Sequence, residues 1–299
     1  MVMIKKYKGY IIKYGDTLFW AEKNKTKFFK CSHEADVIRQ IDSKLRLDEK
    51  GKEDKIKLES VEQRRKELVK HKLVFDAIEF DQFFGSITQL VTETDLCFNK
   101  NMMTTREMDP ANVAMIYQQI KYKGTPIIAQ VLINAQNVYA FIKTARKTKT
   151  WKGKISLYFD LKAEKDMYLF MEGEFGKVNF PVDDDIKNPV KRPNLKFKAT
   201  IKMPLTELKN YVTLARIFGE SVYFEVKDKQ FKIYIERFET NKLGKTTGSD
   251  CISKYSIEYL NKKYFYSENI TLKLSDDYPL LITDEKGNEL ILGPRVDCD

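Results

Sequence analysis

The strongest constraint on the fold is a spacing that occurs twice in the chain. Four segments carry apolar residues at intervals of three and four, which is the pattern of amphipathic helices. They begin near residues 80, 136, 204 and 256, so the separations within the two pairs are 56 and 52 residues. Between them lie strand-like runs such as VAMIYQQI, ISLYFDLKA and SVYFEVKD. A unit of helices and strands that occurs twice predicts two similar α+β domains side by side.

Composition marks the boundaries of these units. The segment 183–194, DDDIKNPVKRPN, is polar and contains two prolines, which predicts an interdomain connector. The segment 46–72 carries many charges of both signs and predicts a charged linker or a solvated helix. The sequence therefore predicts a small module over residues 1–45, a first domain over 73–182 and a second domain over 195–299.

The small module has a pattern of its own. Alternating apolar and polar residues over positions 7–31 predict three short strands. Ser32 is a favourable N-cap for a helix that would follow, with Ala35, Ile38 and Ile41 on one face. We therefore expect a β-β-β-α module, which at this size lies near the lower limit of independent stability.

Positive charge is concentrated in the first quarter of the chain. Residues 1–72 hold 20 Lys and Arg against 12 Asp and Glu, whereas the rest of the chain holds 33 against 31. Such an asymmetry favours a polyanionic partner, most often nucleic acid. A lysine-rich solubilising extension is the alternative.

Groups that could carry catalysis are sparse. Both histidines, His33 and His71, lie outside the two predicted domains, and the four cysteines form no C-x-x-C pair. Cys31 and His33 are close in sequence, but two ligands do not complete a zinc site. The run GEFGKV lacks the spacing of a phosphate loop. We therefore expect no enzyme, no metal and no cofactor.

The sequence also bears on location. No stretch reaches the roughly 18 apolar residues of a membrane span. The first residues, MVMIKKYKGY, lack the apolar core of a signal peptide. We expect a cytoplasmic protein associated with DNA, without a membrane partner.

Two motifs place this organisation in a family. REMDPANVAMI at residues 106–116 looks like a turn and strand that follow the first helix, and SDDYPLLITDEKGNELILGPRVD at 275–297 looks like terminal strands and a tail. With the repeated domain, residues 73–299 resemble the DNA sliding clamps of the archaeal and eukaryotic type, the proliferating cell nuclear antigen family. The resemblance implies a DNA-clamp fold and a replication protein that tethers a DNA polymerase to duplex DNA.

The resemblance also implies a pocket for partner peptides. Clamps of this family bind short segments of polymerases and other replication proteins between the turn, the connector and the tail. Matching by position assigns the pocket to Met108, Asn112, Val113, Met115, Pro279, Gly293, Pro294, Arg295 and Val296. Methionine suits such a pocket because its flexible thioether adapts to different ligands. The alternative is that these residues only hold a turn and a strand.

The helices of clamps line a hole through which the duplex passes, and such a surface binds phosphates without reading bases. The resemblance implies DNA contacts by Lys143, Arg146, Lys147, Lys149, Lys209, Arg216, Lys262 and Lys263, and the N-terminal module adds Lys6, Lys8 and Lys13. A solvated lysine-rich helix face is the alternative. The module itself resembles small domains that place a sheet in the major groove, and a protein-docking role is equally open.

Two features depart from the family. The first helix carries no Lys or Arg and has Asp81 on its polar side. Clamp rings close by pairing edge strands, yet FKIYIERFE leads through NKLGKTTGSD almost directly into the fourth helix, where the family has further strand. A ring trimer is possible, but we expect a monomer. The competing function is therefore a clamp-like DNA-binding or regulatory protein that forms no ring.

Overall fold

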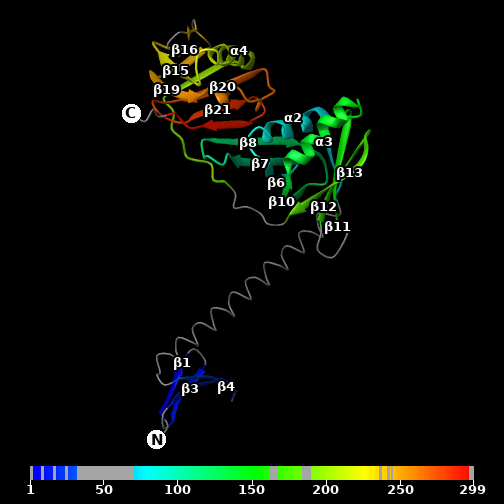
Figure 1. Cartoon of the computed structure of the whole chain (residues 1–299), viewed down its shortest axis with the longest axis vertical. Helices are drawn as coiled ribbons and strands as arrows, with labels where there is room; N and C mark the ends of the chain where they lie inside the picture. The colour runs from blue at the N-terminus through cyan, green and yellow to red at the C-terminus, as the bar shows by residue number, and fades with distance from the viewer. Residues whose placement is uncertain are drawn as a thin grey trace. The chain divides into compact units, whose positions relative to one another are not determined.

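A computed structural model describes the backbone of four strands within residues 3–31, and residues 71–161, 167–183, 190–235, 238–240, 243 and 245–295. The chain divides into two compact units, Met1–Arg64 and Arg65–Asp299 (Figure 1). In the part of the chain that is described, no helix is long and apolar enough to cross a membrane.

The N-terminal unit contains an antiparallel sheet whose strands follow chain order. The strands are β1 (Met3–Tyr7), β2 (Tyr10–Gly15), β3 (Leu18–Lys23) and β4 (Thr26–Cys31). The prediction of three strands is wrong, because Met3–Tyr7 forms a further strand that pairs with β2 in continuous register. The alternation of apolar and polar residues in β1 is interrupted by two adjacent lysines, Lys5 and Lys6, so the sequence did not indicate this strand. The helix expected after Ser32 and the linker 46–70 lie outside the described residues.

The larger unit repeats one order of elements. Its first half contains β5 (Leu73–Asp76), α2 (Ala77–Ile87), β6 (Glu93–Lys100), β7 (Met102–Met108), β8 (Ala114–Lys121), β9 (Lys123–Gly124), β10 (Ile127–Asn134), α3 (Ala135–Lys147), β11 (Lys154–Leu161), β12 (Met167–Gly173) and β13 (Gly176–Asp183). Its second half contains β14 (Ala199–Pro204), α4 (Leu205–Ala215), β15 (Ser221–Lys227), β16 (Gln230–Ile235), β17 (Phe238–Glu239), β18 (Lys245–Gly248), β19 (Cys251–Ser256), α5 (Ile257–Leu260), β20 (Asn269–Leu274), β21 (Leu280–Asp284) and β22 (Glu289–Leu292).

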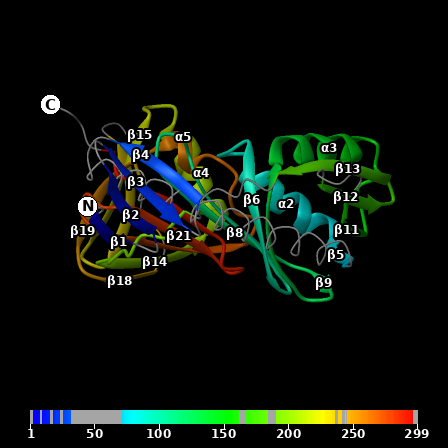
Figure 2. The ribbon, with the colours of Figure 1, turned by 90° about the horizontal axis from the view of Figure 1, so that it is seen from below.

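One antiparallel sheet of 14 strands runs through both halves, in the order β18-β14-β20-β21-β22-β8-β7-β6-β10-β13-β12-β11-β5-β9. The halves meet where β22 pairs with β8, and Figure 2 shows β8 reaching between them. A second sheet has the order β17-β16-β15-β19. The mainly antiparallel α+β architecture agrees with the fold class expected from the repeat.

The sheet of the first half is bounded by one continuous segment. β8 lies at the seam with the second half, and β9, which follows β8 directly, pairs with β5 at the other margin of the sheet. Gly124 makes this pairing possible, because a Cβ at this position would lie 2.5 Å from the carbonyl oxygen of Lys72, and its φ is +134°. A residue other than glycine would clash there.

Local sequence explains where the first two helices begin. The carboxylate of Asp76 accepts the Ile78 amide at 3.0 Å and caps α2, and the side chain of Asn134 accepts the Asn137 amide at 2.8 Å and caps α3. The first helix was expected over 80–91, but it ends at Ile87 and its last apolar residues follow in a turn. Helix α2 packs against α3, and α4 packs against α5.

The fourth helix is much shorter than predicted. It has a single turn, Ile257–Leu260, so Lys262 and Lys263 lie after a helix rather than on one. Tyr264 and Phe265 are both buried although they are adjacent in sequence. The backbone leaves the helix at Asn261, and Tyr264 and Phe265 reach the core from the segment that follows it.

The sequence predicted that little strand would separate FKIYIERFE from this helix, and that prediction is wrong. Between β16 and α5 the structure has β17, β18 and β19, and β19 pairs with β15 along six residues. The alternation of β19 is hard to detect in sequence, because its buried positions are Cys251, Ser253 and Tyr255.

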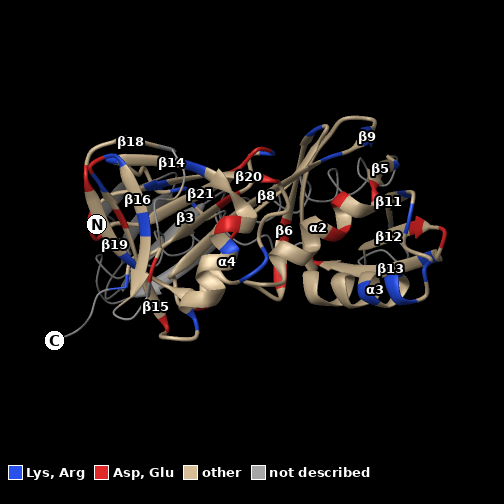
Figure 3. Cartoon of the chain, turned by 90° about the horizontal axis from the view of Figure 1, so that it is seen from above, with Lys and Arg blue, Asp and Glu red and all other residues tan. Residues whose placement is uncertain are grey.

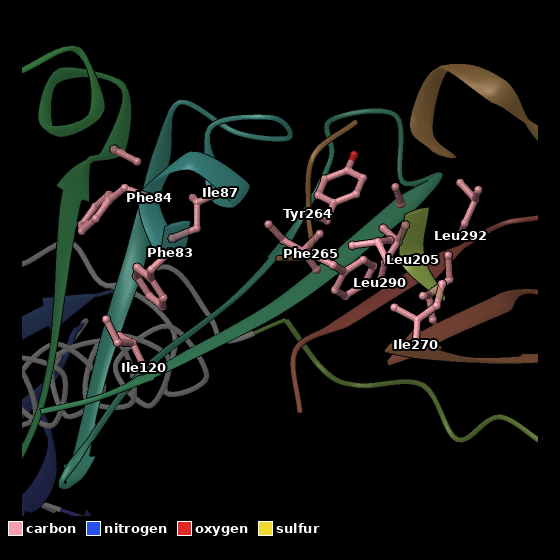
Figure 4. Close-up of a cluster of buried hydrophobic side chains, with 14 of the residues drawn as sticks. Phe83, Phe84, Ile87, Ile120, Leu205, Tyr264, Phe265, Ile270, Leu290 and Leu292 are labelled. Atoms are coloured by element: carbon pink, nitrogen blue, oxygen red, sulfur yellow. The ribbon is translucent and has the colours of Figure 1, made fainter. Parts of the chain in front are cut away.

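The apolar core is continuous between the halves. Phe83, Phe84 and Ile87 of α2 belong to the same cluster of buried side chains as Leu205 of α4 and Leu290 of β22. Figure 4 shows this cluster on both sides of β8. The seam therefore has buried contacts in addition to backbone pairing.

Candidate functional site

A small apolar cluster lies at the seam, separate from the main core. Its buried members are Met115 of β8, Leu281 of β21 and Ile291 of β22. Adjacent pairing in the sheet brings them together, since Met115 is opposite Ile291 and Ile291 is opposite Leu281. Four partly buried residues pack against them: Met108, Val190, Leu195 and Phe197. We call these seven residues the seam cluster.

The seam cluster contains some of the residues predicted for the peptide pocket. Met108 and Met115 face each other across β7 and β8. Val113 is 36% exposed, and its carbonyl oxygen accepts the Gly293 amide at 2.7 Å, so the turn and the tail meet. The remaining predicted positions differ in exposure: Asn112 is exposed with φ of +58°, Pro279 and Pro294 are half-buried, and Arg295 is exposed. Val296 lies outside the described residues.

Sequence reasoning missed the other members of the seam cluster. Leu281 and Ile291 belong to the segment that carried the resemblance, but only the strand register shows that they face Met115. Leu195 and Phe197 follow the predicted connector, and the Phe197 ring packs edge-on against Tyr278 at 6.1 Å between centroids. The sequence offered one signal for this part of the cluster, an aromatic residue, Phe197, shortly after the proline-containing connector.

The Asp109 turn borders the seam cluster and is held by one carboxylate. Oδ1 of Asp109 accepts the amides of Val113 and Ala114, each at 2.7 Å. Oδ2 accepts the hydroxyl of Tyr259 on α5 at 2.6 Å. The side chain is only 5% exposed. The Asp-Pro turn therefore fixes the backbone beside the seam cluster and links it to the second half.

This geometry shifts the pKa of both side chains. Burial acts to raise the pKa of Asp109, but the hydrogen bonds from Ala114, Tyr259 and Val113 outweigh it, and the pKa lies below the ordinary value. Burial, followed by the bond to the Asp109 carboxylate, raises the pKa of Tyr259 to about 12. At neutral pH the pair is therefore an ionised carboxylate and a neutral phenol.

The predicted cations of the first half gather on and after α3 (Figure 3). Lys143, Lys147 and Lys149 are exposed, and the ammonium of Lys143 lies 4.6 Å from the centroid of the Tyr139 ring. Arg146 forms an ion pair with Asp81 of α2, at 3.0 Å between Nη1 and Oδ2. The acidic residue on the first helix therefore neutralises one of the predicted DNA-binding residues.

The cations of the second half differ in environment. Lys209 on α4 is half-buried, and burial together with the nearby Lys263 lowers its pKa. Arg216 is exposed directly after α4. Lys262 lies 3.8 Å from Glu258 and over the Tyr259 ring, and Lys263 lies over the Tyr266 ring. Of these four cations, only Arg216 and Lys263 are exposed.

The lysines predicted in the N-terminal unit lie in or between its strands. Lys6 is in β1 opposite Ile11, and Lys13 is in β2 opposite Ile4. Lys8 lies outside the described residues. Among the described residues, no group of three His, Cys, Asp or Glu side chains is placed to hold a metal ion.

Comparisons with known proteins agree with this geometry. No family model matches the chain. The chain is 25% identical over 251 residues to the DNA polymerase sliding clamp of Methanospirillum hungatei, a match that covers 76% of this chain and 99% of the relative. The sliding clamp of Archaeoglobus fulgidus is 24% identical over 244 residues, covering 72% and 94% of the two chains.

Solved structures give the same result for the fold. The chain superposes on the proliferating cell nuclear antigen of A. fulgidus, in a structure with the C-terminal region of FEN-1, with a TM-score of 0.65 and 19% identity, covering 77% of this chain and all of the other. The antigen of Entamoeba histolytica gives 0.61 and 16%, covering 76% and 99%.

The fold is therefore that of a DNA clamp, with two α+β halves joined through β8 and β22. The resemblance to the sliding clamps of the proliferating cell nuclear antigen family is confirmed over about 76% of the chain.

Proposed function

We propose that the chain is a clamp-like DNA replication protein, which binds duplex DNA through phosphate contacts and recruits a polymerase and other replication proteins through the seam cluster. It acts as a scaffold and carries out no catalysis. The support from sequence is the match to three relatives named DNA polymerase sliding clamp, two of them along 99% of their length.

The observation that carries the proposal is the seam cluster. A separate apolar cluster, whose three buried members are bordered by four partly buried residues that include Met108 and Val190 of the connector, would fit a short peptide with aromatic or aliphatic anchors. One solved neighbour, the A. fulgidus clamp, is described with the C-terminal region of FEN-1 bound to it. A peptide that buried apolar area there would gain about 25 cal/mol per Å².

Calorimetric titration with a peptide that carries the family's aromatic-rich motif tests this proposal. We expect binding by the unmodified chain and weaker binding by the Met115→Ala, Pro294→Ala double variant. Met102→Ala is the matched control, because Met102 is a half-buried methionine of β7 outside the seam cluster. Absence of binding by the unmodified chain, or equal loss in the control, would contradict the pocket.

The alternative function is a clamp-like protein that forms no ring, and one observation favours it. One end of the second sheet is β17, of which the described residues comprise only Phe238–Glu239, and an edge of that length would offer little backbone for pairing with another copy. We therefore propose a monomer.

A second observation favours contact between copies. Leu214, Ile217 and Phe218, at the end of α4, are 45%, 74% and 50% exposed, and neighbouring exposed apolar residues mark interaction surfaces. Light scattering on the purified protein distinguishes the two forms. If the unmodified protein has the mass of a trimer and Phe218→Ser has the mass of a monomer, the proposed monomer is wrong and the protein forms a ring.

A further inference from the structure

The strand register of the N-terminal sheet places an aromatic residue between two lysines. Lys13 of β2 is opposite Trp20 of β3, and Trp20 is opposite Lys30 of β4. On its other side, Lys13 is opposite Ile4 of β1. These four residues form one row across all four strands.

A second row on the same face adds further lysines. Residues two positions apart in a strand share a face of the sheet, so Lys6, Ile11 and Glu22 lie on the same face as the Trp20 row. The register between β3 and β4 shifts between Ala21 and Glu22, and this shift brings Lys27 opposite Glu22. We call these two rows the lysine face. It holds four lysines, one glutamate and one tryptophan, and its members are Ile4, Lys6, Ile11, Lys13, Trp20, Glu22, Lys27 and Lys30.

The opposite face has a different composition. Its rows contain Met3, Tyr14, Phe19 and Cys31, then Lys5, Ile12, Ala21 and Phe29, then the pair Tyr7 and Tyr10 and the pair Lys23 and Thr26. A sheet with one mainly apolar face buries that face. We therefore take the lysine face, rather than the mainly apolar one, as the face that would meet a ligand. A purely solubilising extension would not need this segregation.

The combination of lysines with a central tryptophan indicates the chemistry of the ligand. Neighbouring strands lie about 4.8 Å apart, so Lys13 and Lys30 are about 10 Å apart on either side of Trp20. A nucleic-acid strand with unstacked bases can place one base on an indole while its phosphates contact flanking cations. A duplex keeps its bases stacked on each other and offers such a row only phosphates.

We propose that the lysine face binds single-stranded nucleic acid, with Trp20 as the stacking position and Lys13 and Lys30 as phosphate contacts. The inference goes beyond duplex binding and peptide recruitment, and rests on the proposed function only in placing the chain near replicating DNA. It gives the N-terminal unit a ligand distinct from that of the clamp.

Fluorescence anisotropy with the full chain tests the proposal, using labelled oligothymidylate and a labelled duplex of equal length. We expect Trp20→Ala to weaken binding of oligothymidylate by about 5- to 100-fold, as the loss of one stacked base implies. Trp20→Phe should retain most of the affinity, because a phenyl ring still offers a face to a base.

Two double variants with equal charge loss provide the control. Lys13→Gln with Lys30→Gln removes the cations of the Trp20 row, whereas Lys5→Gln with Lys23→Gln removes two lysines from the other face. We expect the first pair to weaken oligothymidylate binding several-fold more than the second, and both pairs to weaken duplex binding equally.

Equal losses in the two double variants, or an unchanged affinity in Trp20→Ala, would overturn the proposal in favour of non-specific charge. If Trp20→Ala disrupts the sheet, judged by far-ultraviolet circular dichroism, Trp20→Phe and the two lysine pairs still decide. The peptide titration of the unmodified chain is independent of these residues, so failure of either proposal can be recognised separately.

Discussion

The hydroxyl of Tyr259 donates a hydrogen bond of 2.6 Å to Oδ2 of Asp109, and this bond joins α5 of the second half to the turn beside the seam cluster. The other carboxylate oxygen holds the Val113 and Ala114 amides. The turn is thus fixed both by its own backbone and by a residue 150 positions away.

Replacement of Tyr259 by Phe tests how much this hydrogen bond contributes to stability and to peptide binding. A hydrogen bond to an ionised group contributes more than one between neutral groups, and partial exposure of Tyr259 reduces the effect. We expect Tyr259→Phe to lower the free energy of unfolding by about 1 kcal/mol and to weaken peptide binding in the calorimetric titration. Tyr117→Phe is the control, because its hydroxyl makes only a long bond of 3.4 Å to Gln119. Equal effects in the two variants would contradict a specific role for Tyr259.

The lowered pKa of Asp109 predicts a pH dependence. Because the folded pKa lies below that of the unfolded chain, the carboxylate contributes stability that is fully present above the unfolded value, near 3.8, and is lost as pH falls through the folded pKa. We expect Asp109→Asn to be less stable than the unmodified chain at neutral pH, with a difference that shrinks on acidification. Urea unfolding at a series of pH values measures it. A difference that stays constant with pH would contradict the assignment.

The Arg146–Asp81 ion pair predicts that loss of the Asp81 charge increases the affinity for DNA. Asp81→Asn removes the partner of Arg146 and leaves that guanidinium free for phosphate. We expect tighter duplex binding and a steeper salt dependence, by about one counterion in the slope. Glu174→Gln is the matched control, because it also removes a carboxylate paired with a cation, Lys152, at an exposed position. Equal gains in both variants would indicate net charge alone.

The uneven charge of the chain predicts where most affinity for linear duplex lies. Residues 1–72 carry the basic excess, so their removal should abolish most equilibrium binding to linear duplex. Charge reversal at Lys143, Arg146 and Lys147 should have the smaller effect. Anisotropy over a salt series is the measurement, and the affinity of the intact chain should fall steeply with salt. Unchanged binding by the truncated chain would place the duplex site on the clamp helices.

Much of the fold was predictable because local signals were strong. Helix α3 begins at Ala135, within one residue of the start that the apolar stripe predicted. Helix α5 was overpredicted, because the spacing of Ile257, Leu260 and Tyr264 suits a helix, whereas the backbone leaves the helix after Leu260 and Tyr264 is buried from the segment that follows. Strand β19 was missed, since Ser253 occupies a buried position and obscures the alternation.

The seam cluster was predictable in part. Met115 could be assigned from its motif, but its neighbours depend on strand pairings between residues far apart in the sequence. Ile291 is opposite Met115, and no periodicity within either segment reveals that pairing. The role of Asp109 was likewise hidden, because a turn signal does not show that a distant tyrosine completes the carboxylate's hydrogen bonds.

The continuous segment β8–β9 has a mechanical consequence. Because this segment is paired with β22 at the seam and with β5 at the far margin, a displacement at the seam is transmitted along covalent bonds to the strand that leads into α2. The first half therefore resists shear between its sheet margins. The second half repeats this arrangement, since β17 pairs with β16 and β18, later in the same segment, pairs with β14 at the end of the sheet. Both halves should therefore resist shear between their sheet margins, and elastic deformation under load should not be confined to one of them.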